Sequence, residues 1–131
     1  MTKIIRTENL ANGIKVEFKD CSNRYYGDYH RVRIEVRCSF PLTPAVLGQA
    51  ADSEEEQDKI RKIIGEKYVY TRVLEQMGVP GDALDETRRN LIDSFAGSTF
   101  SYMAHPSFPL RLIEKELERR GKVHRPFGNP R

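Results

Sequence analysis

An alternation of apolar and polar residues from Arg31 to Phe40 constrains the fold of this chain more than any other feature of its sequence. Successive side chains of a β-strand point to opposite faces, so the alternation predicts a strand with one buried face and one solvated face. The side predicted to meet the core carries Val32, Ile34, Val36, Cys38 and Phe40. The other side carries Arg31, Arg33, Glu35, Arg37 and Ser39. A pairing error of one residue would bury the arginines, so the register of this strand is strongly specified.

A second alternating segment covers residues 14–19, where Ile14, Val16 and Phe18 share one face. The intervening residues 20–29 are rich in turn-forming types. They predict a long loop that joins two antiparallel strands.

A helix signal and a third strand signal follow. Ser53 precedes a run of glutamates, a pattern that caps the N-terminus of a helix and complements its dipole. The apolar stripe of this helix includes Ile60, and Gly65 is predicted to end it in the left-handed helical conformation. Residues 67–74 are mainly aromatic and β-branched, which favours a strand, although a helix continuing to Met77 is the alternative.

Two further helices are predicted near the carboxyl end of the chain. Residues 82–103 carry apolar side chains at helical spacing. The next helix begins after Ser107, with Pro109 in its first turn, and is predicted to stop at Gly121. The predicted order is β-β-α-β-α-α, with a short additional strand over residues 3–6 as an option.

This order predicts an α+β fold, in which the helices pack on one face of a three-stranded antiparallel sheet. The length of 131 residues suits one domain, which we place at residues 1–122. Residues 123–131 contain prolines and basic residues without periodicity, so we expect a flexible basic tail there.

The sequence also indicates the cellular compartment of the protein. Its first residues lack the apolar stretch of a secretory signal, and no segment has the roughly 20 apolar residues that span a bilayer. We therefore expect a cytoplasmic protein that does not bind membranes. Cys21 and Cys38 fit a reducing compartment, in which a disulfide between them is not expected.

The basic face of the predicted sheet is the first candidate site. Cations with interleaved aromatic rings can bind an anion or a single-stranded nucleic acid, because the cations hold phosphate and the rings stack on bases. The candidate residues are Lys15, Arg31, Arg33, Arg37, Tyr70 and Arg72. An ordinary solvated sheet face explains the same pattern and is favoured, since the exposed face of an antiparallel sheet is normally polar.

The second candidate is the tyrosine-rich part of the predicted loop, which offers contact area to a partner or ligand. Its residues are Tyr25, Tyr26, Tyr29 and His30. The favoured alternative is that these rings fold over the end of the core.

We find no pattern that predicts a catalytic centre, a metal site or a cofactor site. The three histidines are scattered, and neither cysteine has the ligand spacing of a zinc site. A nucleophilic pair of Cys21 or Cys38 with His105 is the strongest enzymatic option, but no activating motif surrounds it. Whether the chain is an enzyme stays open, with a non-enzymatic role favoured.

Two function hypotheses remain. The first is a protein–protein interaction module that pairs a strand edge with another protein or with a second copy as a homodimer. The Arg31–Phe40 strand is the natural template if it lies at an edge. The alternative is a binder of nucleic acid or another anionic ligand, which would use the basic sheet face.

Overall fold

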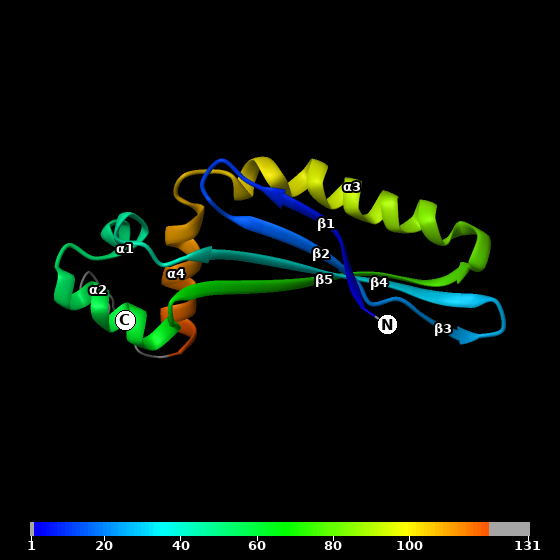
Figure 1. The fold of residues 1–131 in the computed structure, drawn as a ribbon, viewed down its shortest axis with the longest axis horizontal. Coiled ribbons are helices and arrows are strands. Elements are labelled where there is room, and N and C mark those ends of the chain that lie inside the picture. The colour runs from blue at the N-terminus through cyan, green and yellow to red at the C-terminus, as the bar shows by residue number, and fades with distance from the viewer. Residues whose placement is uncertain (1, 121–131) are drawn as a thin grey trace. The chain divides into compact units, whose positions relative to one another are not determined.

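The structure is a computed structural model that describes residues 2–120. It is an α+β fold with a five-stranded antiparallel sheet and four α-helices in the described residues (Figure 1). The elements in chain order are β1 (Lys3–Asn9), β2 (Lys15–Asp20), β3 (Asn23–Tyr26), β4 (Tyr29–Pro41), α1 (Pro44–Ala50), α2 (Glu54–Ile64), β5 (Lys67–Pro80), a short 3-10 turn (Gly81–Ala83), α3 (Leu84–Met103) and α4 (Phe108–Arg119). The α+β class and the antiparallel sheet were predicted correctly, but the prediction of three strands undercounts the sheet.

The described chain divides into two compact units. The first contains residues 2–40 and 69–105 and holds the sheet with α3. The second contains residues 41–68 and 106–120 and holds α1, α2 and α4. Compact units can fold as one cooperative domain, so the single domain over residues 1–122 stays a prediction. The tail predicted at residues 123–131 lies outside the described residues.

One long hairpin forms the centre of the sheet. In this hairpin β2 and β3 both pair with β4 in one register. The pairing continues without a shift from Lys15 opposite Ser39 to Asn23 opposite Arg31. Between β2 and β3, the pairing continues because the amide of Cys21 donates to the carbonyl of Arg33 over 2.8 Å. The predicted loop over residues 20–29 is therefore wrong, because this segment contains β3 and a tight turn.

The turn of this hairpin needs few residues. Gly27 supplies a φ of +53°, and Tyr26 is already opposite Tyr29. Turn-forming residue types upstream of Gly27 suggested a longer loop, but backbone pairing to β4 outweighs their local preference.

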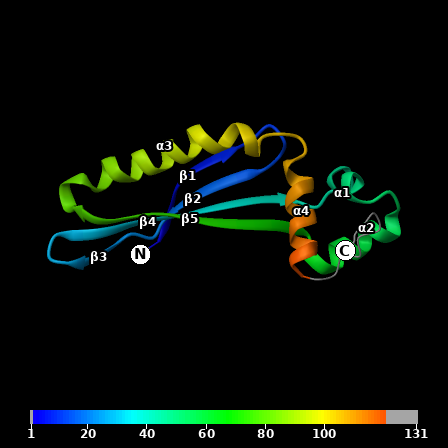
Figure 2. The same cartoon turned by 180° about the vertical axis from the view of Figure 1, so that it is seen from behind.

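The helix α3 packs on the apolar face of the sheet, which Figure 2 shows from behind. The ring of Phe18 on β2 meets Phe95 of α3 edge to face, with centroids 6.0 Å apart. Phe100 of α3 lies 6.2 Å from the same ring. The sheet residues that are fully buried are Ile14, Val16, Phe18, Val32, Ile34 and Val36. These are the residues that the two alternating segments place toward the core, so this prediction is confirmed.

Polar contacts hold both ends of α3 to turns of the sheet. The side-chain amide of Asn12, in the turn between β1 and β2, donates to the carbonyls of Met103 and His105 over 2.6 and 3.0 Å. At the other end, the amide of Gly81 donates to the Asp28 carboxylate over 3.2 Å. The helix is thereby fixed along the length of the hairpin.

The helix starts in the second unit follow local sequence signals. Ser53 accepts a hydrogen bond from the amide of Glu56 over 3.2 Å, which confirms the predicted cap of α2. Gly65 ends α2 with φ +114° and ψ −168°, a positive φ outside the left-handed helical region that we expected. The helix α1 was not predicted, although Thr43 caps it and Pro44 lies in its first turn.

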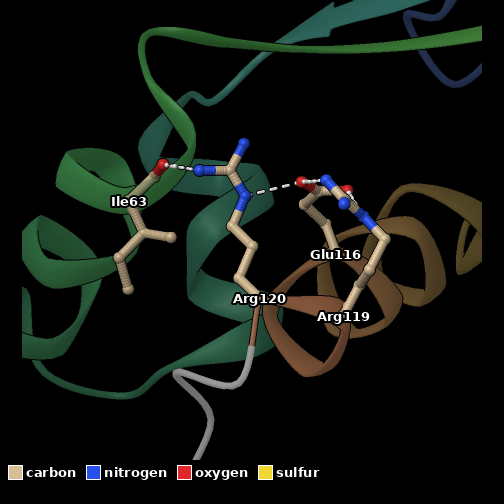
Figure 3. A network of polar contacts seen from close by, with 4 residues as sticks. All are labelled: Ile63, Glu116, Arg119 and Arg120. Atoms are coloured by element: carbon tan, nitrogen blue, oxygen red, sulfur yellow. Dashed lines mark hydrogen bonds and ion pairs between the residues drawn. The ribbon is translucent and has the colours of Figure 1, made fainter.

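An ion-pair network links the ends of α2 and α4 within the second unit (Figure 3). The Glu116 carboxylate accepts hydrogen bonds from Arg119 and Arg120, each as short as 2.6 Å. Arg120 also donates to the carbonyl of Ile63 at the end of α2 over 2.7 Å. The arginine hydrogen bonds lower the pKa of Glu116 below its ordinary value. The carboxylate thus orients Arg120 for its contact with α2.

Candidate interaction surface

The outer face of the sheet, opposite α3, carries the predicted cations, and most of them have acidic neighbours. Arg31 and Arg33 share Glu75 of β5, with nitrogen–oxygen distances of 3.4 and 3.8 Å. Lys19 lies directly opposite Glu35, 3.8 Å from its carboxylate. These pairs compensate a large part of the positive charge on this face.

The remaining cations of the outer face are Lys15 and Arg37. Lys15 lies 3.6 Å from the carboxylate of Glu17 on its own strand. Arg37 is directly opposite Glu17, and its side chain makes no hydrogen bond or ion pair with any described residue. This balance of charge is what a solvated antiparallel sheet face requires, because like charges directly opposite each other destabilise a sheet.

Tyr70 and Arg72 do not join these cations. The guanidinium of Arg72 lies over the ring of Phe95 on α3, 5.8 Å from its centroid. Glu75, by contrast, contacts the arginines of the outer face. Since strand side chains alternate, Tyr70 and Arg72 share the face toward α3. The predicted cluster of cations and aromatic rings is therefore divided between the two faces of the sheet.

The tyrosines of the second candidate site lie at the closed end of the hairpin, not in a loop. Tyr25, Tyr26 and Tyr29 are all exposed, and Tyr26 is the most exposed at 74%. The favoured interpretation, in which these rings fold over the end of the core, stays a prediction. His30 lies beside them, and its Nδ1 is 3.1 Å from the carbonyl oxygen of Asp28.

An apolar row on β5 is a surface feature that we did not predict as a site. It consists of Val69, Val73 and Met77, whose side chains are 37, 39 and 55% exposed. Their spacing of four residues puts them on one face of the strand, the outer face that Glu75 shares. The hydroxyl of Tyr25 approaches the end of β5, 3.9 Å from where a Cβ on Gly78 would lie. The sequence signal was present in the alternation of residues 67–74.

The position of β5 in the sheet exposes more than side chains. Among the described residues, β5 pairs with β4 alone, so it forms an edge of the sheet. The strand β4 has β2 and β3 on its other side and is internal. The expectation that the Arg31–Phe40 strand could be the template for pairing is therefore wrong, and the long edge strand is β5.

The described residues contain no group of three or more His, Cys, Asp and Glu side chains that could hold a metal ion. Cys21 and Cys38 are free thiols. Cys38 is directly opposite Val16 of β2. Cys21 follows Val16 by five residues, so along an extended chain it lies about 16 Å from that position. A disulfide needs Cα atoms within about 7 Å, so this geometry excludes one. Burial raises the pKa of the Cys38 thiol to about 11, which makes it a poor nucleophile.

No helix of the described residues is long and apolar enough to cross a membrane. Comparisons of the chain with models of protein families, with curated proteins and with solved structures found no match.

Proposed function

We propose that this protein is a protein–protein interaction module that binds an extended strand of its partner along the free edge of β5. The observation that carries the proposal is the character of this edge. It is 14 residues long, pairs on one side only within residues 2–120, and carries the apolar row on its outer face. An exposed, long and partly apolar edge strand is a template for pairing with another strand.

The other edge of the sheet shows how such pairing is normally prevented. The strand β1 is seven residues long, and its register with β2 is broken between Ile4 and Arg6. Arg6 and Glu8 are opposite Phe18 and Val16, so they place charges on the face toward α3. Short length, irregular register and inward-pointing charges all protect an edge from pairing.

The apolar row of β5, from Val69 to Met77, lacks effective protection of this kind. Lys67 lies at the start of the strand, before this row, and the two charges within the row, Arg72 and Glu75, are engaged within the chain. Arg72 lies over Phe95, and Glu75 takes Arg31 and Arg33 as partners. Neither Arg72 nor Glu75 is left to repel an incoming strand at the apolar row. The contrast with β1 therefore supports a binding role for β5.

Site-specific photo-crosslinking in cells that produce the protein tests this proposal. A benzophenone amino acid at Met77 should give a covalent adduct with a protein, because this side chain borders the free edge. The control is the same probe at Ser94, which is exposed on α3 in the same unit. Mass spectrometry of the adduct then identifies the partner. Absence of any protein adduct specific to position 77 would overturn the proposal.

The anion-binding alternative rests on Lys15, Arg31, Arg33 and Arg37. It predicts that binding of single-stranded nucleic acid weakens steeply with salt, and that replacing the three arginines with glutamine abolishes it. We expect no such binding, because Arg31 and Arg33 are already paired with Glu75. Salt-dependent binding that the triple variant loses would favour the alternative instead.

A further inference from the structure

We infer that the strand received by β5 is β5 of a second copy, paired antiparallel about a two-fold axis at Val73. This inference rests on the proposed function and adds the identity of the partner and the register. It is carried by the self-complementary order of side chains along the free edge.

Backbone geometry limits the registers that are available. In a strand, the amide and carbonyl of one residue point to the same side, and those of the next residue point to the other side. The groups that reach the free edge therefore belong to alternate residues. Two copies of β5 can pair only if odd-numbered residues are opposite odd-numbered ones, so the two-fold axis must pass through a residue and not between two.

The register centred on Val73 matches the apolar row to itself. Val73 is then opposite Val73 of the second copy, and Val69 is opposite Met77 in both directions. Thr71 is opposite Glu75, so no like charges meet on the outer face. All the exposed apolar side chains of the row thereby contact apolar partners, which is the arrangement that stabilises a cross-strand pair.

The registers centred on residues 72, 74 and 75 are worse. Centring the axis on Arg72 or on Glu75 places a charge directly opposite its own copy. Centring it on Leu74 places Val73 opposite Glu75, and Met77 opposite Thr71, which separates the apolar row. The register at Val73 also suits the face toward α3, because it sets Arg72 opposite Leu74.

Matched arginine substitutions test the register through the oligomeric state. Sedimentation velocity over a range of protein concentrations should show a monomer–dimer equilibrium for the wild type. Val73→Arg puts two arginines opposite each other on the axis and should raise the dimer Kd about tenfold or more. The control Thr71→Arg has the same chemistry two positions away but faces Glu75 of the second copy, so it should keep the wild-type affinity or tighten it.

Cysteine crosslinking provides a second readout that does not depend on affinity. In a Cys21→Ser background, Val73→Cys should form an intermolecular disulfide on mild oxidation, since directly opposite Cβ atoms lie about 5 Å apart. Thr71→Cys should not, because the two copies of that residue are four positions apart, about 13 Å.

A strict monomer at every concentration would overturn the inference, as would a dimer that Val73→Arg leaves unchanged. Crosslinking at position 71 in place of 73 would reject the register. The photo-crosslinking adduct at Met77 separates the two proposals. An adduct with a different protein supports the interaction module and rejects the second copy, whereas no adduct rejects both.

Discussion

The buried thiol of Cys38 makes the stability of this protein depend on alkaline pH. Its side chain is 2% exposed on the apolar face of β4, and burial raises its pKa from 9.0 to about 11. Above pH 9 the unfolded chain releases this proton, while the folded chain keeps it until about pH 11. The unfolded state then binds fewer protons, so the stabilisation is complete below pH 9 and is lost as the pH rises through 11.

The size of the effect follows from the pKa difference. Each pKa unit corresponds to about 1.4 kcal/mol, so the full difference amounts to about 3 kcal/mol in the free energy of unfolding. Between pH 8 and pH 10, the loss of stability contributed by Cys38 is about 1 kcal/mol. A loss of this size can be resolved in a urea unfolding curve.

The assay compares the wild type with Cys38→Ala by urea unfolding at pH 8 and at pH 10. The substitution lowers stability at both pH values, because it removes buried atoms. Titration of tyrosines and other groups is common to both proteins, so only the difference between their pH effects reports on Cys38. The wild type should lose about 1 kcal/mol more than the variant. Equal losses in the two proteins would refute the reasoning.

Four further substitutions test the packing and polar contacts, each by equilibrium unfolding. Phe18→Ala removes the ring that meets α3 and should cost about 3–5 kcal/mol. Asp20→Ala removes the carboxylate 2.8 Å from Nε of the half-buried Arg88 and leaves the exposed Asp85 as its partner, so it should cost about 1–2 kcal/mol, between exposed and buried ion pairs. Ser53→Ala should cost about 1 kcal/mol through loss of the α2 cap, with faster hydrogen exchange in its first turn. Glu116→Gln should flatten the acid limb of stability, because the lowered pKa of Glu116 gives stabilisation that is lost as the pH falls through its folded value. An unchanged stability or acid limb in any of these variants contradicts the contact assigned to it.

Local patterns in the sequence were sufficient where one element carries its own signal. The alternation in residues 14–19 and 31–40 predicted both strands and their buried faces, because a period of two admits one orientation toward a core. Ser53 and Gly65 predicted both ends of α2, since capping involves only neighbouring residues. These features needed no knowledge of what packs nearby.

The candidate sites depended on which strands are neighbours, and local patterns do not contain that information. The outer-face cations were predicted, but their pairing with Glu75 was not, because it requires β5 beside β4. The sequence likewise could not place Tyr70 and Arg72 on the face of α3 or recognise β3 as a strand.

The amino-acid pattern was enough to assign the buried and solvated faces of the strand from Arg31 to Phe40, because side-chain alternation is a local property. The internal position of this strand, and the position of β5 with its apolar row at the free edge, followed from the assembled sheet. An edge is defined by the absence of a neighbour within the described residues, and strand order arises from contacts between segments far apart in the chain. The surface proposed for binding was therefore visible only after the sheet was assembled.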